Sequence, residues 1–448
     1  MLNQKKPQHT NQIRISIYVI AFFNLLIVIA TWWFHSGALM TSGKQGDMLI
    51  SLGRITGLLA EFFILVELIL VGRITWLEQL FGYDKMNMIH RWIGYGVLIF
   101  FIGHPLLSVI GNAEQNGVGA VVQFLNFIHI GEYMRGLIGF LLFLVAVILS
   151  YPIAKKKLRY ETWYFVHLVM YVAIGLVVGH QTFSETGDVS NGIALYYWFV
   201  LNYGIFGVVL AYRWIRPFYL FHKHRFYVSD VKMETESVYS IYVKGKDMSS
   251  YAFQAGQYAN LNFLQKGMWF THPFSFSCAP NGEYLRFSVK SLGDFTNTIS
   301  KIKLGTKVFI DGPMGLFTEA QSITDKYLFI AGGIGITPAL SLIQALSIKE
   351  KDITLLYANK ISTDIAFKEE LETLEHNHHF IISDMIDNGK TSYETGRVDR
   401  EKIKRLVHDV KKRDVYICGP VAMIEVVIQI LQEIGVPQKQ IHFEKFSY

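Results

Sequence analysis

The stretch IHRWIGYGVLIFFIGHP, residues 89–105, places one histidine near each end of an apolar run. His90 and His104 are fourteen residues apart, a separation of roughly 20 Å along an α-helix. The run has the length and composition of a helix that crosses a lipid bilayer, whose hydrocarbon core is about 30 Å thick. The sequence therefore predicts two imidazoles at different depths in a membrane.

The apolar character extends through the first half of the chain. Of the 448 residues only 17% are charged and 51% are hydrophobic, too apolar for a wholly soluble protein. No small-residue cleavage site follows the first apolar run, so we expect that run to be retained. After about Pro217 the sequence changes to charged residues, glycine turns and alternating strands. Six runs are predicted to span the membrane: Ile15–Phe34, Ile55–Val71, Ile89–Ile110, Tyr133–Ile153, Trp163–Gly179 and Ile193–Tyr212.

Lysine and arginine are concentrated in the loops on one side of the predicted bundle. The positive-inside rule then places both termini in the cytoplasm. The formal net charge of +6 is better explained by contact with anionic lipid than by binding of nucleic acid, which we do not expect.

Only two cysteines occur, Cys278 and Cys418, both in the second half. This number excludes a disulfide framework, a cysteine-ligated zinc site and a four-cysteine iron–sulfur cluster within the chain.

A second histidine pair lies in the fifth predicted span, where His167 and His180 enclose HLVMYVAIGLVVGH. The third and fifth spans both enter from the cytoplasmic side, so His90 should face His167 at the inner level and His104 should face His180 at the outer level. Two neutral imidazoles at one level, with no cysteine or carboxylate beside them, suit axial ligation of a haem. A single histidine in a span is as readily a buried, hydrogen-bonded residue, but two matched pairs favour two b-type haems with these four residues as iron ligands.

The spacing in the fifth span fits an ideal helix less well. Thirteen residues leave His180 about 140° around the helix from His167, whereas fourteen bring His104 back to within about 40° of His90. The fifth span is then either locally rewound, or its ligands approach from different faces. Several glycines would leave room for flat macrocycles against the backbone: Gly94, Gly96, Gly103, Gly175 and Gly179.

The role of each of several other polar residues in the predicted bundle has two interpretations. Arg54 and Arg73 flank the second span, where they would hold a haem propionate or snorkel to the interface. Arg135 begins the fourth span and has the same two interpretations. Glu61 and Glu67 are costly in lipid and indicate either a proton path or a polar helix contact.

The second half predicts two folding units. From about Phe218 to Phe317 short strands alternate with turns, as in a small antiparallel barrel. Within it, VKSLGDFT at 289–296 ends a strand in a glycine turn before an expected helix, where backbone donors and the Thr296 hydroxyl would suit a pyrophosphate. Helix capping by Thr296 or Thr298 is the alternative.

The stretch YLFIAGGIGITPALSLI at 327–343 reads as a strand, a glycine-rich turn and a helix. Thr337 is expected at the helix cap and Pro338 in its first turn, the mechanics of a dinucleotide phosphate loop. The strands ITLLYANK, HFIISDMI and DVYICGP complete a parallel α/β unit. The fold class is thus an α+β membrane protein, with a six-helix haem-binding bundle at 1–217, a β-barrel domain at 218–322 and an α/β parallel-sheet domain at 323–448.

These stretches resemble the ferredoxin-NADP reductase superfamily, and with the histidine pairs the chain resembles a bacterial single-chain member of the NADPH oxidase and ferric reductase family. The resemblance implies FAD, two b-type haems and NADPH or NADH as cofactors, in the bacterial plasma membrane. It places Ser275 near the reactive flavin nitrogen and Cys418 beside the nicotinamide ring as catalytic residues. It assigns the flavin to His272, Pro273, Phe274 and Ser275; the FAD pyrophosphate to Lys290, Gly293, Asp294, Phe295 and Thr296; the nicotinamide-cofactor loop to Gly332, Gly333, Gly335, Thr337 and Pro338; and the nicotinamide motif to Cys418, Gly419 and Pro420.

The resemblance also implies an aromatic side chain stacked on the flavin, and Phe446 and Tyr448 both fit this role. Lys360 lies where the family often has a cation for the 2′-phosphate of NADPH, which gives NADPH a slight preference over NADH.

We expect electrons to pass from cytosolic NAD(P)H through FAD and the two haems to oxygen on the outer face, giving superoxide. Arg54 would attract this product anion. Many family members carry a further histidine one turn beyond the outer ligand, where this chain has Ser108. Ferric iron or a ferric chelate is therefore an alternative acceptor, and an unidentified partner protein or a quinone is another.

Overall fold

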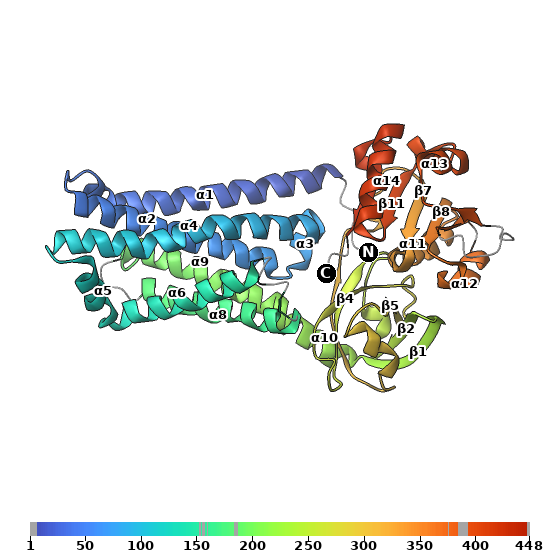
Figure 1. The fold of residues 1–448 in the computed structure, drawn as a ribbon, viewed down its shortest axis with the longest axis horizontal. Coiled ribbons are helices and arrows are strands. Elements are labelled where there is room, and N and C mark those ends of the chain that lie inside the picture. Colours follow the sequence, from blue (N-terminus) through green and yellow to red (C-terminus); the bar gives the residue numbers. More distant parts are fainter. Residues whose placement is uncertain are drawn as a thin grey trace. The chain divides into compact units, whose positions relative to one another are not determined.

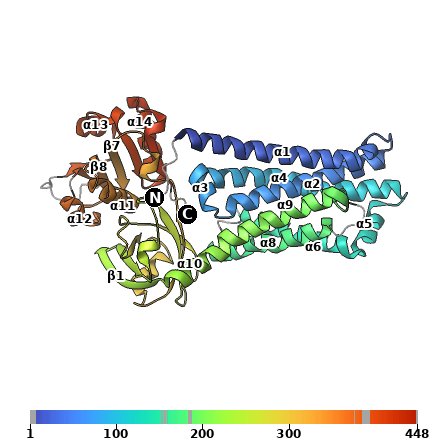
Figure 2. The same ribbon diagram turned by 180° about the vertical axis from the view of Figure 1, so that it is seen from behind.

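The computed structural model describes residues 7–445 apart from 152–153, 155–156, 159, 183–186, 375 and 384–392. The chain forms two compact units (Figures 1 and 2). One contains the helices up to Ile74 and those from Lys85 to Tyr212, and the other contains Thr75–Asp84 together with the chain from Arg213 onward. The three-domain division at 217 and 322 stays a prediction.

The first unit is a bundle of long helices that run side by side in both views (Figures 1 and 2). Among the described residues, five helices are long and apolar enough to cross a membrane, or six if α2 and the short helix α3 (Thr75–Phe81), bent by 92° at their junction, form one span. The number of six spans stays a prediction. The main helices are α1 (Pro7–Met40), α2 (Gln45–Val71), α4 (Tyr83–Gln115), α6 (Gly131–Ser150), α8 (Tyr160–Thr182) and α9 (Gly192–Leu210), with α5 (Ala120–Ile128) before α6.

The third predicted span, Ile89–Ile110, lies within α4, which continues through Pro105 to Gln115. Proline is tolerated inside membrane helices, where neighbouring groups satisfy the carbonyl that its ring leaves without a donor. The bundle interior is apolar and combines several helices: Leu65 of α2, Phe101 of α4, Phe143 of α6 and Ile174 of α8 belong to one buried cluster.

The longer segment of the second unit starts at Arg213, inside a π-helical turn (Ala211–Ile215) that leads into α10 (Arg216–His224). Two antiparallel three-stranded sheets follow, and the isolated bridges Tyr227–Lys307 and Phe276–Phe287 join neighbouring segments of them. Both sheets bury phenylalanines in one shared core. Their closure into a barrel stays a prediction. In spatial order the sheets are β1 (Tyr227–Thr235), β2 (Val238–Lys244) and β5 (Leu285–Lys290); and β4 (His272–Ser275), β3 (Tyr258–Phe263) and β6 (Val308–Met314).

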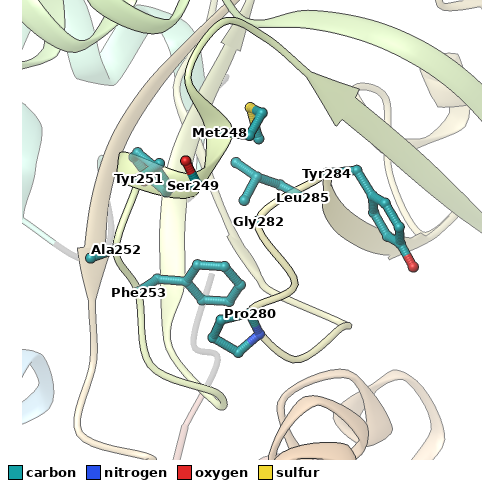
Figure 3. Close-up of a pocket in the computed structure, with 9 residues that line it drawn as sticks. All are labelled: Met248, Ser249, Tyr251, Ala252, Phe253, Pro280, Gly282, Tyr284 and Leu285. Carbon is teal, nitrogen blue, oxygen red and sulfur yellow. The ribbon is translucent and has the colours of Figure 1, made fainter.

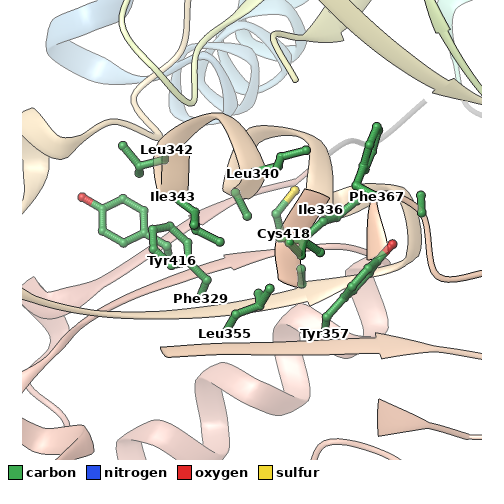
Figure 4. Close-up of a cluster of buried hydrophobic side chains, with 14 of the residues drawn as sticks. Phe329, Ile336, Leu340, Leu342, Ile343, Leu355, Tyr357, Phe367, Tyr416 and Cys418 are labelled. Carbon is green, nitrogen blue, oxygen red and sulfur yellow. The ribbon is translucent and has the colours of Figure 1, made fainter. Parts of the chain in front are cut away.

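The remaining chain forms a six-stranded sheet in which every pairing is parallel. Alternate residues of its strands point to opposite faces, so Phe329 packs under α11 (Ile336–Ser347) as Figure 4 shows, and Leu328 packs with α13 (Arg400–Leu406) and α14 (Val421–Ile434). The spatial order is β10 (Glu394–Thr395), β9 (Asn377–Ile382), β8 (Asp352–Asn359), β7 (Lys326–Gly332), β11 (Asp414–Cys418) and β12 (Ile441–Glu444). The order reverses between β7 and β11. In open parallel sheets, ligands bind at the carboxyl ends of the strands beside such a switch point.

Candidate functional site

The structure brings the four membrane histidines together in the two predicted pairs. The ring centroids of His90 and His167 are 6.2 Å apart, and those of His104 and His180 are also 6.2 Å apart. Two imidazoles that share one metal ion at roughly 2 Å each hold their centroids about 6 Å apart. The pairs therefore have the separation that one iron atom between them requires.

In each of these imidazoles the structure gives a hydrogen bond at Nδ1. His104 donates to the carbonyl oxygen of Gly53 at 2.7 Å, and His180 donates to that of Glu132 at 3.0 Å. His90 contacts the Glu67 carboxylate through Nδ1. A partner at Nδ1 fixes the tautomer that presents the Nε2 lone pair to a metal.

The fourth imidazole, that of His167, contacts the hydroxyl group of Ser150, whose hydrogen atom is already donated to another acceptor. Ser150 Oγ donates to the Ala146 carbonyl at 2.7 Å and accepts from Trp163 Nε1 at 3.1 Å, so His167 Nδ1, 3.2 Å away, is the donor to this oxygen. All four histidines then have the same tautomer.

Helix α2 supports both pairs, which the sequence did not reveal. A Cβ atom added at Gly57 would lie 2.7 Å from His104 Nδ1, so only glycine lets the imidazole lie against the α2 backbone. Glu67, ten residues further along α2, contacts His90. Because the partners of a buried histidine depend on how helices pack, the only signal in the sequence was the presence of glycines and a carboxylate in a span.

The residues present fit haem better than a protein-only metal site. Among the described residues no three His, Cys, Asp or Glu side chains form a metal-binding group, and haem needs only two axial ligands from the protein. At the glycines proposed to make room, an added Cβ would meet no atom closer than 3.8 Å: Gly94, Gly96, Gly103, Gly175 and Gly179. Both pairs form despite the thirteen-residue spacing in α8, with different interplanar angles of 87° and 57°.

The arginines predicted to hold propionates have other contacts. Arg54 Nη1 is 3.1 Å from Asp188 Oδ1 and 3.0 Å from Ser36 Oγ, an arrangement that balances its charge with a buried carboxylate. Arg135 pairs with Glu132 at 3.1 Å. Arg73 lies in the turn between α2 and α3 with a positive φ of 54°. The propionate role of these residues stays a prediction.

In the second unit the predicted flavin motif forms strand β4. His272 stacks on Phe295 with centroids 3.8 Å apart, which brings the two predicted flavin segments together. Pro273 and Phe274 pair with β3, as does Ser275, whose neighbour across the strands is Tyr258. Ser275 Oγ is buried and has no partner in the described part of the chain, so this hydroxyl is available to a bound group.

The predicted pyrophosphate loop is organised by Thr296. Its hydroxyl accepts the backbone N–H groups of Leu292 and Gly293 at 2.9 Å each, while Asp294 is exposed. The expected helix is only the six-residue 3₁₀ helix Thr296–Lys301, so its N-terminus offers less attraction to a pyrophosphate than predicted. The prediction of a pyrophosphate site therefore rests on the backbone N–H groups of the loop. Lys290 forms an ion pair with Asp364 at 3.3 Å.

The glycine-rich loop after β7 meets the loop after β11 at the switch point of the sheet. A Cβ at Gly332 would lie 2.7 Å from Met423 Sδ, and one at Gly335 would collide with the Cys418 carbonyl. Gly419 has a φ of 157° and lies against Gly332. Burial raises the pKa of the Cys418 thiol well above its ordinary value, so this thiol stays protonated.

The helix after this loop begins differently from the prediction. The N-cap of α11 is Gly335, preceded by a 3₁₀ turn at Gly333–Gly335, and Thr337 lies inside the first turn with its hydroxyl donating to the Ile334 carbonyl at 3.0 Å. The placement of Thr337 at the cap was wrong because the tight glycine turn starts the helix earlier. Pro338 is in the first turn, as predicted.

Four predicted residues remain, of which the structure describes Lys360 and Pro420. Lys360 is exposed directly after β8. Pro420 is the N-cap of α14. Phe446 and Tyr448 lie outside the described residues, so the flavin-stacking aromatic stays a prediction.

A buried acidic cluster that the sequence analysis did not predict lies beside these loops. Glu78 Oε1, on α3, accepts the Tyr258 hydroxyl at 2.8 Å and the Gly315 N–H at 3.2 Å. Glu444 ends β12 in register with Cys418. Burial, and then the nearby carboxylates of Asp84 and Glu78, raise the pKa of Glu444 to about 8. No composition or spacing signal links residues so distant in the chain.

One pocket of about 240 Å³ lies elsewhere in the β-sheet domain (Figure 3). Its lining combines Met248, Phe253, Pro280 and Leu285 with the side chain of Tyr284, and it contains none of the predicted cofactor residues. The pocket is too small for a dinucleotide, so the motifs above define the candidate site.

Comparisons with known proteins match all three parts of the chain. Residues 56–178 match the family described as ferric reductase like transmembrane component, 223–318 match an FAD-binding domain, and 329–429 match an oxidoreductase NAD-binding domain. The first match contains three of the paired histidines and ends two residues before His180.

Curated relatives match about half of the chain. Flavohemoprotein A of Dictyostelium discoideum is 29% identical over 246 residues, covering 50% of this chain and 60% of that protein. The NADPH oxidoreductase of Mycobacterium tuberculosis is 25% identical over 226 residues, covering 48% of this chain and 58% of that protein. The chain thus spans about 60% of the length of these relatives. The flavohem-like FAD/NAD binding domain of a Vibrio cholerae nitric oxide dioxygenase is 23% identical with a TM-score of 0.44, over 49% of this chain and 98% of that structure.

Proposed function

Since the chain belongs to the family that fuses a ferric reductase-like transmembrane domain to FAD- and NAD-binding domains, we propose that it carries electrons from cytosolic NAD(P)H across the membrane to oxygen, giving superoxide. Membrane location and NAD(P)H-dependent oxidoreductase chemistry follow from the family, whereas the haems, the route and the acceptor belong to the proposal. Bound FAD would convert a hydride into single electrons, and two haems would carry these electrons one at a time.

The observation that carries the proposal is the geometry of the two histidine pairs. His90 with His167, and His104 with His180, have equal ring separations, and each imidazole is oriented through Nδ1. Residues fourteen apart on α4 lie about 20 Å apart along the helix. This geometry supports two ligand sites at different depths.

Residues of the second unit support hydride transfer from NAD(P)H to FAD. The unpartnered Ser275 hydroxyl supports the flavin role of β4. The protonated Cys418 thiol, at the end of β11, supports a position beside the nicotinamide ring without a charge that would compete with hydride transfer. The close backbone packing of Gly335 and Gly419 shapes the loops for a pyrophosphate.

Ferric iron or a ferric chelate is the second candidate acceptor. The Asp188 carboxylate offsets the charge of Arg54, which reduces its pull on a superoxide anion. Ser108 adjoins Gly53, where an added Cβ would lie 2.7 Å from its hydroxyl oxygen, so no second imidazole is offered there. A partner protein or quinone at the outer face is a third possibility.

The test is an anaerobic reduction followed by reoxidation. Protein purified in detergent with FAD receives NADPH, or NADH in a parallel sample, while its visible spectrum is recorded, and air is then admitted with a superoxide trap. The proposal predicts rapid reoxidation and a trapped product that superoxide dismutase abolishes. Reduced protein that stays reduced in air but is oxidised by a ferric chelate would replace oxygen with iron as the acceptor.

A further inference from the structure

Glu61 is a carboxyl group that no role described so far uses. Its side chain is 1% exposed, and within the described ranges neither carboxylate oxygen has a hydrogen-bond partner. A charged group without partners in a low-dielectric interior is strongly unfavourable, so an isolated carboxyl there holds a proton unless a positive charge is near.

Helix α2 places Glu61 between the depths of the two histidine pairs. Gly57 of α2 contacts His104 of the outer pair, and Glu67 contacts His90 of the inner pair. With a rise of 1.5 Å per residue, Glu61 lies about 6 Å along the helix axis from Gly57 and about 9 Å from Glu67.

The side chain of Glu61 also projects into the bundle. Leu58 and Leu65, one turn before and after it, are 5% and 1% exposed. Leu65 belongs to the buried cluster that includes Phe101 of α4 and Ile174 of α8, the two helices that carry the histidines. Glu61 therefore lies in the apolar interior between the pairs and not toward lipid.

No fixed cation at this depth offsets its charge. Between the levels of the two pairs, α4 carries Tyr95 and also Arg91, which adjoins His90 and is exposed. The titratable side chains in the corresponding stretches of α8 and α9 are phenols: Tyr171, Tyr197 and Tyr203. The corresponding stretches of α1 and α6 contain none. The groups that change charge on either side of Glu61 are thus the two histidine sites themselves.

We propose that Glu61 is a proton-binding site, which takes a proton from water when an electron enters the bundle and returns it when the electron leaves. The inference rests on the proposed function, because the ferric form of a bis-histidine haem carries one positive charge that the ferrous form lacks. The electron comes from NAD(P)H and the proton comes from hydronium in the surrounding water. The O–H bond of the carboxyl forms as an O–H bond of hydronium breaks, and both changes reverse when the electron leaves. At roughly 10 Å and an effective dielectric constant of about 20, one charge changes the proton affinity of Glu61 on the order of tenfold.

The experiment measures protonation directly, with purified protein that contains its haems. Infrared difference spectra between the oxidised and reduced states are recorded with unlabelled and with ¹³C-glutamate-labelled protein. The inference predicts a protonated-carboxyl C=O band that appears on reduction, shifts with the label and is absent in Glu61→Gln. A wild-type spectrum without such a band overturns the inference whether or not the variant folds.

Redox titrations at pH 6, 7 and 8 give the second readout. The inference predicts that the haem midpoint potential falls with rising pH in the wild type and in Glu61→Asp, and that this slope is lost in Glu61→Gln. Asn202→Leu is the matched control, because Asn202 is a fully buried polar residue on α9 that has an unpartnered oxygen within the described chain but does not titrate. An unchanged slope in Glu61→Gln, or an equal loss in Asn202→Leu, overturns the inference.

The outcomes separate this inference from the proposed function. Haem that NAD(P)H reduces normally, with a potential independent of pH, overturns only the role of Glu61. A wild-type protein without haem overturns both.

Discussion

Substitution of Gly57 by alanine tests whether α2 holds the outer histidine for a ligand role. The added Cβ would lie 2.7 Å from His104 Nδ1 and 3.0 Å from Cε1, so the imidazole must move by about 0.7 Å to reach an ordinary contact of 3.4 Å. The ring is held on the same side by the Gly53 carbonyl at 2.7 Å, and it cannot move without weakening that hydrogen bond. Overpacking of this kind costs about 1–3 kcal/mol, which corresponds to roughly a 5- to 150-fold loss in affinity at the outer site.

The assay is the haem-to-protein ratio of the purified variant, measured with the visible spectrum before and after addition of haem. We expect Gly57→Ala to lose outer-site haem and to keep inner-site haem. Gly204→Ala is the matched control, since this helical glycine of α9 has no atom within 4 Å of an added Cβ. Full haem content in Gly57→Ala, or an equal loss in Gly204→Ala, would refute the reasoning.

Three further predictions concern buried carboxylates. Glu67→Gln removes the negative charge beside His90 and should raise the reduction potential of the inner haem; a redox titration in which neither potential rises would contradict this. Tyr258→Phe removes a buried hydrogen bond to Glu78 and should lower stability by about 1–3 kcal/mol; an unchanged melting temperature, followed by flavin fluorescence, would count against it. The pKa of Glu444 is raised from 4.5 to about 8, so its contribution to stability is full below about pH 4.5 and is lost as the pH rises to about 8, with a slope of at most about 1.4 kcal/mol per pH unit. Urea unfolding at pH 6 and 8 should therefore show a smaller difference for Glu444→Gln than for the wild type, and equal differences would exclude a proton held at this site.

The sequence was most informative where one physical requirement acts along a single element. Apolar length predicted the spanning helices, and the spacing of His90 and His104 along one helix predicted two levels that the structure pairs with His167 and His180. The parallel sheet followed similarly from buried strands that alternate with helices.

Features that depend on packing between elements could not be predicted in the same way. Glu67 and the Gly53 carbonyl hold their histidines because α2 lies beside α4 with a particular rotation. Glu78 meets Tyr258 only after the segment between α2 and α4 joins the second unit. The incorrect prediction of Thr337 as the helix cap is a local example. The glycines there form a 3₁₀ turn, which residue propensities do not predict.

The central claim is that the two histidine pairs hold haem iron that NAD(P)H can reduce. The most direct measurement is the anaerobic visible spectrum of the purified protein with FAD, before and after addition of NADPH, together with the haem count. The account predicts two low-spin b-type haems per chain, both reduced by NADPH, and the loss of one haem when either His104 or His180 is replaced by alanine. A protein without low-spin haem, or one whose haem NADPH and NADH both fail to reduce, would contradict it.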